Sequence, residues 1–213
     1  MTTPVPQKDN KLLYAAGDVI VWAGLPNTGA PAAFEDVTAI TGGTYVCLGW
    51  VDTSGYIFKL DETIKDIPAA GVLTPIRSIL TGGSKTVQAT LLEALNPHVR
   101  ALYDDVPIFP TASSPLKPAS GTVASYIIPD PPDDNRYSLI FDSIDGDKSM
   151  RLYAPFAKVT ARGNDQVQQA DIESMDITWT FYPGIIDDGT TQDGGVAKRY
   201  IDYGIDVTDY FGS

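Results

Sequence analysis

Apolar and polar residues alternate with a period of two along much of the chain, and this pattern predicts a protein built mainly of β-strands. The clearest run is "DITWTFYP", in which Ile177, Trp179 and Phe181 alternate with threonines and a tyrosine. Aromatic and β-branched residues in this alternation are typical of a strand that buries one face. The proline at the end of the run predicts that the strand stops there.

A β-hairpin is predicted over residues 136–163, where Asp145 and Gly146 form a turn signal between two apolar-rich runs. Further strands are predicted at 19–25 and at 42–60, the second of them interrupted midway by a Ser-Gly pair. In the hairpin we expect Tyr137, Leu139 and Phe141 to share one face of the first strand, and the returning strand to carry Leu152, Ala154 and Phe156.

One short helix is predicted after Asn96. This residue suits the N-cap, and Pro97 suits the first helical position, where its missing N–H is not needed. The carboxylates of Asp104 and Asp105 are unfavourable at the negative C-terminal end of a helix, so we expect the helix to end there. Its apolar stripe is expected at Val99, Leu102 and Tyr103.

The stretch "LTGGSKTVQATLL" (80–92) has the residue types of a phosphate-binding loop without its spacing. Such a loop needs a glycine directly before the lysine, but Ser84 precedes Lys85. Downstream, apolar residues alternate with polar ones, as in a strand. We therefore interpret Gly82 and Gly83 as a turn that leads into a strand.

Composition divides the chain into a central domain with an arm at each end. We predict an N-terminal arm at 1–18, a β domain at 19–186 and a C-terminal arm at 187–213. A Pro-rich loop at 106–135 interrupts the domain. The C-terminal arm carries too many aromatic and β-branched residues for a disordered tail. Both arms are expected to bury these side chains, either on neighbouring copies or on their own subunit.

The charge balance argues against sequence-specific nucleic-acid binding, because 15 Lys and Arg are outnumbered by 27 Asp and Glu, a net charge of −12. Cys47 is the only cysteine, which excludes a disulfide within the chain and a zinc site built from its cysteines. The N-terminus lacks the apolar core of a signal peptide, and no run approaches the ~20 apolar residues of a membrane span. We expect a soluble protein made in a cytoplasm.

No motif for catalysis or for a bound metal stands out. His98 is the sole histidine, and no nucleophile motif accompanies it. Cys47 lies in an apolar run and is expected to be a small buried side chain. The acidic clusters at 142–147 and 187–195 miss EF-hand spacing, so we interpret them as a hairpin turn and a solvated loop. We predict no enzyme activity and no cofactor, although a distant pair of carboxylates for hydrolysis stays open.

The chain resembles the major tail tube protein of phages with long non-contractile tails, especially the actinobacteriophage type. Three segments carry the resemblance: "CLGWVDTSGYIFKLDETIKDIPAAGVLTPIRSILTGGSKTVQATLLEALNPHVRALY", "RYSLIFDSIDGDKSMRLYAPFAKVTARGN" and "ADIESMDITWTFYP". Together they cover about residues 40–183. The resemblance implies a mainly β fold, a β-sandwich or half-barrel with one short flanking α-helix, an extended loop and terminal arms.

The resemblance also implies a function. Six copies would form a ring, and stacked rings would form the tail tube, a negatively charged conduit that DNA crosses during ejection without specific binding. The partners would be other copies of the chain and further tail proteins, namely the tape measure, the tail terminator and the distal tail protein. No membrane would be involved, and the virion would take up protein made in the host bacterial cytoplasm.

Three groups of residues follow from this resemblance. The segment Lys59–Thr74 resembles the loop that reaches the next ring, with contacts expected at Lys59, Asp61, Glu62, Ile64, Lys65 and Ile67. The arms are expected to contact neighbouring subunits through Leu12, Tyr14, Ile201, Tyr203 and Phe211. Exposed acids that line the channel, or else the solvated outer surface, are expected to be Asp142, Asp145, Asp147, Asp171 and Glu173.

A second interpretation, from another class of protein, stays open. In it the chain is a carbohydrate- or receptor-binding β-sandwich module of a virion. Exposed aromatic side chains would serve as platforms for sugar rings, with Trp22, Trp50 and Tyr56 as the candidates. Such a module would remain a monomer or form a small closed oligomer.

Overall fold

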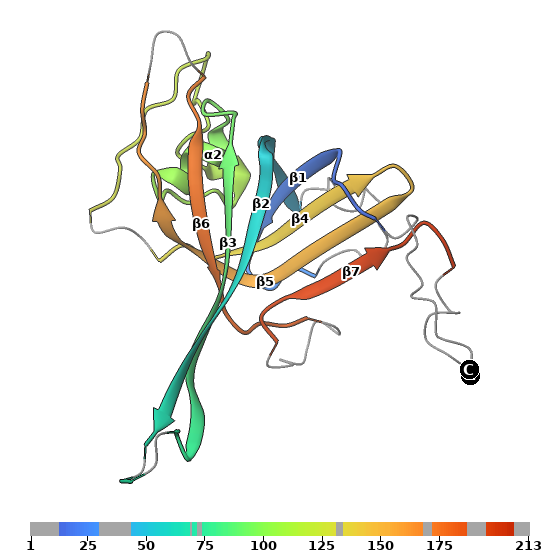
Figure 1. Cartoon of the computed structure of the whole chain (residues 1–213). Helices are drawn as coiled ribbons and strands as arrows, with labels where there is room; N and C mark the ends of the chain where they lie inside the picture. Colours follow the sequence, from blue (N-terminus) through green and yellow to red (C-terminus); the bar gives the residue numbers. More distant parts are fainter. Residues whose placement is uncertain are drawn as a thin grey trace.

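The computed structural model describes residues 13–29, 44–68, 70–71, 74–130, 134–167, 172–186 and 195–206. In this part of the chain, one antiparallel sheet is flanked by one short α-helix (Figure 1). The expected mainly β fold is therefore confirmed. The helices are α2 (Pro97–Tyr103) and the 3₁₀-helix η2 (Thr111–Ser113). The strands are β1 (Asp18–Gly24), β2 (Tyr45–Ile67), β3 (Arg77–Leu91), β4 (Tyr137–Asp145), β5 (Lys148–Arg162), β6 (Met175–Phe181) and β7 (Lys198–Asp202).

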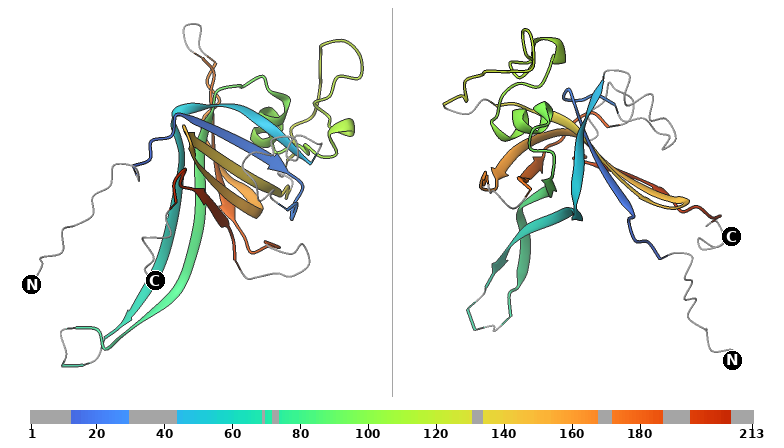
Figure 2. Two further views of the ribbon diagram at one scale, coloured as in Figure 1. Left: turned by 90° about the vertical axis from the view of Figure 1, so that its right-hand side faces the viewer. Right: turned by 90° about the horizontal axis from the view of Figure 1, so that it is seen from above.

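The sheet bends until its members meet again. Its order is β4-β1-β2-β3-β6-β5-β7, and β4 also pairs with β5, so that six strands form a closed cycle and β7 adds to it along β5. The far halves of β2 and β3 leave this body as a long two-stranded hairpin, which both views of Figure 2 show. This arrangement is consistent with the expected half-barrel.

All six strands of the cycle contribute to one apolar core, against which α2 packs. In β6, Ile177, Trp179 and Phe181 are buried, as the alternating pattern predicts. The ring of Trp179 meets that of Phe141 edge-on, with 5.7 Å between the centroids. A phenylalanine or leucine side chain buried in this way contributes roughly 1.5–3 kcal/mol through the hydrophobic effect. The pattern that predicts strands therefore also builds the core.

The predicted hairpin is β4–β5, and its turn contains Gly146 at φ +58°. A shift in register between Tyr137 and Leu139 moves the returning strand by one residue, so that Ala154 and Ala157 face β4 in the core. Phe156 lies on the returning strand, as predicted, but outside the core. Its ring lies instead 4.9 Å from the guanidinium carbon of Arg136 and edge-on to Tyr182.

β2 is longer than predicted. It runs for 23 residues, Tyr45–Ile67, so residues 59–67, expected within an extended loop, are strand. The predicted interruption near Ser54 is a shift in the register with β3 between Val51 and Tyr56. Val51 and Tyr56 are five residues apart in β2, whereas their partners Leu91 and Ala89 are two residues apart in β3, so the extra residues of β2 bulge out and the pairing resumes beyond them.

The pair Gly82–Gly83 lies inside β3, opposite Thr63 and Glu62 of β2. The turn predicted at these glycines is wrong, whereas the strand predicted after them is correct. Glycine in a strand costs roughly 0.5–1 kcal/mol relative to alanine, but the hydrogen-bonded ladder with β2 holds both residues in extended geometry.

The predicted helix is confirmed. The Asn96 side chain accepts a hydrogen bond from the backbone N–H of His98 at 3.0 Å, and the helix ends at Tyr103. Val99 and Leu102 are buried. The N-cap and the buried face of the helix thus lie at residues that the sequence predicts.

Two further expectations concern loops and burial. The Pro-rich loop buries Val106, Ile108 and Leu116 in the core, so part of it packs onto the body. Cys47, expected to be buried, is exposed. The reason is strand alternation, since Leu48 takes the core side of β2 and Cys47 the other.

Candidate functional site

The most distinctive surface is the hairpin arm, which we define as residues 59–67 of β2 and 77–85 of β3. Among the described residues these two segments pair only with each other, because β1 reaches β2 no further than Trp50 and β6 meets β3 from Thr86 onward. Each segment therefore has a free edge of backbone N–H and C=O groups. Edges of this kind are templates for pairing with a strand of another chain.

Apolar side chains continue from the core onto the hairpin arm. Phe58 packs against the core, with its ring centroid 6.1 Å from that of Phe181. Leu60, two residues further out on the same face, is 61% exposed, and Leu80 on the other strand is exposed to the same extent. Covering one such leucine is worth roughly 1.5–3 kcal/mol. The hairpin arm is therefore stabilised by whatever covers this face.

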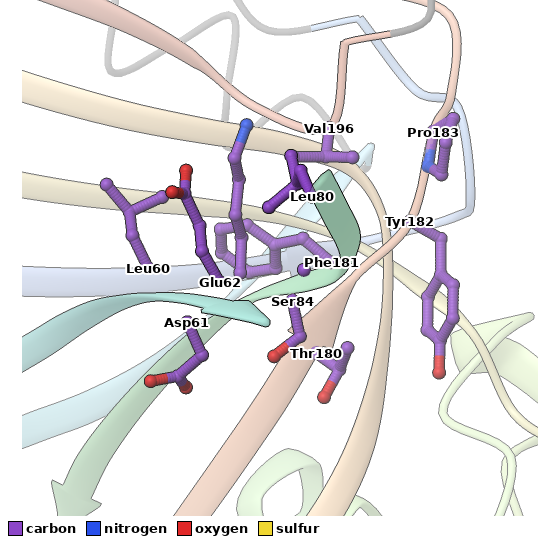
Figure 3. A pocket seen from close by; sticks show the side chains of 12 residues that line it. Leu60, Asp61, Glu62, Leu80, Ser84, Thr180, Phe181, Tyr182, Pro183 and Val196 are labelled. Atoms are coloured by element: carbon purple, nitrogen blue, oxygen red, sulfur yellow. The ribbon is translucent and has the colours of Figure 1, made fainter. Parts of the chain in front are cut away.

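A groove of about 530 Å³ lies where the hairpin arm joins the body (Figure 3). Leu60, Glu62 and Phe181 project to one side of the sheet in this view, whereas Asp61 and Ser84 project to the other. The lining of the groove thus combines apolar side chains with the charged Glu62 on one side of the sheet. This composition is typical of contacts between proteins.

The six contact residues predicted in this region all lie together on the β2 strand of the hairpin arm. Five of them are exposed, while Ile67 at the end of the strand is half-buried. The segment is a strand rather than a loop, and its side chains therefore alternate between two faces. The predicted residues are Lys59, Asp61, Glu62, Ile64, Lys65 and Ile67.

The described parts of the two arms meet on their own subunit. Tyr14 donates a hydrogen bond from its hydroxyl to the Ser143 hydroxyl at 2.6 Å, and β7 pairs with the first half of β5. Tyr14, Ile201 and Tyr203 line one small pocket of about 240 Å³. The sequence leaves open whether the arms pack on their own subunit or on neighbouring copies. The described residues of both arms pack on their own subunit. Leu12 and Phe211 lie outside the described residues.

The predicted channel acids do not form one group. Asp142 is buried, with 7% of its surface exposed, and accepts hydrogen bonds from Nε and Nη2 of Arg151 at 2.7 and 2.9 Å. The expectation that Asp142 is an exposed acid is therefore wrong. Its position opposite Arg151 on β5 makes it half of a buried ion pair.

The other acids differ in their surroundings. Asp145 accepts a hydrogen bond from the backbone N–H of Ala15 at 3.1 Å, and Asp147 is exposed in the β4–β5 turn. Glu173 forms an ion pair with Arg100 at 2.6 Å. Asp171 lies outside the described residues. Of the four described acids, Asp147 is thus the one whose side chain is exposed on the surface.

The residues considered for other chemistry are dispersed. Burial lowers the pKa of His98, and the described residues contain no group of three potential metal ligands. The proposed aromatic platform does not exist as a unit, because Trp22 is buried and Tyr56 packs 5.2 Å from Phe141 between ring centroids. Trp50 is exposed. In the described part of the chain, no helix has the length and apolarity of a membrane span.

Comparison with known proteins places the chain in one family. Residues 5–190 match the family model described as phage tail tube protein. No curated protein matches the chain. The family match covers every strand except β7.

Proposed function

The chain belongs to the phage tail tube protein family, and we propose that it forms hexameric rings that stack into the tube of a long, non-contractile tail. Membership of this family makes it a structural tail protein of a virion that assembles with itself and with other tail proteins. The ring, the stacking and the role of the tube as a conduit for DNA are our proposal.

The hairpin arm carries this proposal. Its two backbone edges are unpaired and its leucines, Leu60 and Leu80, are exposed to water, and both features are unfavourable in a single subunit. Pairing with strands of neighbouring copies removes the free edges, and packing against them covers the leucines. Repeating one such heterologous contact around a rotation axis closes a ring.

The hairpin arm extends beyond the body and serves the contact between rings. Lys59, Asp61, Glu62, Ile64 and Lys65 lie on its exposed β2 strand. In an assembled tube, we expect these side chains to lie against the next ring. The chain beyond the described parts of the arms, with Leu12 and Phe211, contacts neighbouring subunits in the same proposal.

The net charge of −12 suits a conduit for DNA. Lys and Arg side chains that touch phosphates add affinity through counterion release, whereas carboxylates repel the polyanion. Asp145, Asp147 and Asp171 are the acids that we propose for the channel wall. The proposed partners in the tail are the tape measure, the tail terminator and the distal tail protein, and synthesis takes place in the host bacterial cytoplasm.

Electron microscopy of the purified protein at increasing concentration, with light scattering in parallel, tests the proposal. We expect sixfold rings and hollow tubes from the natural protein. Leu80→Asp places a charge on the uncovered face of the hairpin arm and should abolish assembly without unfolding the subunit. The matched control is Val123→Asp, which changes a side chain that is 79% exposed on the Pro-rich loop.

A natural protein that stays monomeric at every concentration, also when tail initiation proteins are added, contradicts the proposal. So does normal assembly of Leu80→Asp. Far-UV circular dichroism of each variant separates a loss of assembly from a loss of folding.

A further inference from the structure

We propose that a surface at the opposite end of the sheet from the hairpin tip receives that tip from a second copy of this chain. We call it the receiving surface and define it as Trp50, Glu93, Leu95 and Ile172. The hairpin tip is defined as Ile64, Lys65, Ile76, Arg77 and Ile79. The inference rests on the stacking of rings proposed above and names the two surfaces that meet.

The receiving surface and the tip lie at opposite ends of β3. The N–H of Leu92, just after β3, donates to the carbonyl of Trp50 at 2.8 Å, which places Trp50 at this end of the strand. Arg77, the first residue of β3, is 14 residues before Leu91, or roughly 45 Å at the rise of a strand. In Figure 1 the tip lies at the bottom and α2, which follows this end of β3, at the top. The two surfaces therefore cannot meet within one subunit.

The receiving surface is apolar and grooved. Trp50 is 70% exposed, Leu95 90% and Ile172 72%. A groove of about 340 Å³ runs along Trp50 and is floored by Ile20 and Trp22. A second groove, of about 560 Å³, lies between Leu95 and Ile172. Exposed apolar side chains grouped around grooves mark a contact with another protein.

Glu93 is a positioned carboxylate that both grooves share. Its Oε1 accepts from the backbone N–H of Trp50 at 3.3 Å, and its Oε2 accepts from Nδ2 of Asn96 at 3.1 Å. Gly49 makes room for it, because a Cβ there would lie 2.2 Å from Cδ of Glu93, and its φ of +80° also favours glycine. Asp18 adds a second carboxylate to the first groove. The receiving surface is thus apolar with a negative centre.

The hairpin tip has the complementary character. Ile64 is 59% exposed, Ile76 64% and Ile79 36%. Lys65 and Arg77 are exposed beside them, and among the described residues neither forms an ion pair. The carboxylate of the neighbouring Asp66 accepts a hydrogen bond from the Ser78 hydroxyl, so cations outnumber carboxylates at the described part of the tip. In a chain of net charge −12, two cations among exposed isoleucines fit an apolar surface with a carboxylate at its centre.

Contact between these two surfaces propagates along one direction. Because they differ and lie at opposite ends of the subunit, the contact is heterologous, and each copy that binds leaves its own tip available. A ring carrying six tips on one side and six receiving surfaces on the other would stack without limit. The hairpin tip and the receiving surface are thereby the two sides of the ring-to-ring contact.

The first test removes the aromatic side chain at the receiving surface. Trp50→Ser changes a mostly exposed residue, so the subunit should fold, and rings should still form. Stacking should need a concentration at least about tenfold higher, as for a truncated aromatic side chain at the centre of an interface. The control is Ile127→Ser, at a residue that is 89% exposed on the Pro-rich loop. Tubes from Trp50→Ser at the natural concentration overturn the inference.

The second test uses the native cysteine. Cys47 lines the groove beside Trp50, and Thr74→Cys adds a thiol in the exposed loop of the hairpin. Treating assembled tubes with a short bismaleimide should give a ladder of covalent multimers on a denaturing gel, and Cys47→Ser in the same background should abolish it. Tubes that form without a ladder overturn the inference and leave the proposed function standing. A natural protein that forms neither rings nor tubes overturns both.

Discussion

The burial of Asp142 beside Arg151 can be tested directly, because breaking a buried ion pair lowers the stability of the subunit. The two side chains face each other across β4 and β5 and share hydrogen bonds of 2.7 and 2.9 Å. The Arg151 side chain is 2% exposed. Asp142→Asn keeps the shape of the side chain and removes its charge, so the buried guanidinium loses the negative charge of this carboxylate.

Removing one partner of a buried ion pair destabilises a protein by roughly 3–5 kcal/mol, mostly because of the charge that is left behind. For a chain of about this length, 1 kcal/mol shifts Tm by roughly 2–4 °C. We therefore expect Asp142→Asn to lower Tm by roughly 6–20 °C. Replacing both partners, as in Asp142→Leu with Arg151→Met, should recover most of the loss, since a well-packed apolar pair is often as stable as a buried ion pair.

The assay is thermal and urea unfolding of the subunit, kept below the concentration at which it assembles. Emission from the fully buried Trp179 reports the transition. Asp147→Asn is the matched control, because Asp147 lies in the turn of the same hairpin and is exposed; we expect no measurable change. If Asp142→Asn were as stable as this control, Asp142 would have to be solvated, and the assignment of a buried pair would be refuted.

Two further predictions concern α2. Burial lowers the pKa of His98 below its ordinary 6.5, so its contribution to stability is present above that pH and is lost as the pH falls through the folded-state pKa; an NMR titration of this sole histidine should give a lower midpoint than in the urea-unfolded chain, and equal midpoints would contradict its burial. Asn96→Ala removes the N-cap acceptor and should cost about 1 kcal/mol in urea unfolding, whereas Asn96→Ser should retain most of the stability; an equal loss in both would show that the cap is not the cause.

The elements set by local chemistry could be predicted from the sequence. The helix follows from Asn96 and Pro97, and the core strand β6 from the alternation of Ile177, Trp179 and Phe181. The β4–β5 hairpin follows from its turn. In each case a property of neighbouring residues determines the outcome, so one sequence read with helix and strand rules is enough.

The features that depend on partner strands could not be predicted in this way. Gly82 and Gly83 favour a turn by local preference, but pairing with β2 keeps them extended. Phe156 leaves the core because of a register shift at the start of β4, and the burial of Asp142 follows from the cation opposite it on β5. One signal could have extended β2, since Phe58, Leu60 and Ile64 keep the period of two beyond Gly55, with the charged Glu62 as the one exception. The receiving surface has no local pattern, because distant segments form it.

The hairpin arm exposes both an apolar face and free strand edges, a combination that normally invites aggregation. What distinguishes it from an aggregation-prone strand is the charge between its apolar residues, carried by Lys59, Asp61, Glu62, Lys65, Asp66, Arg77 and Lys85. Charges of both signs on a free edge disfavour every pairing that sets like charges opposite each other. Only a partner in the matching register gains the apolar contacts without that repulsion. The charged residues of the hairpin arm would then determine which surface it binds, while its isoleucines and leucines supply the affinity.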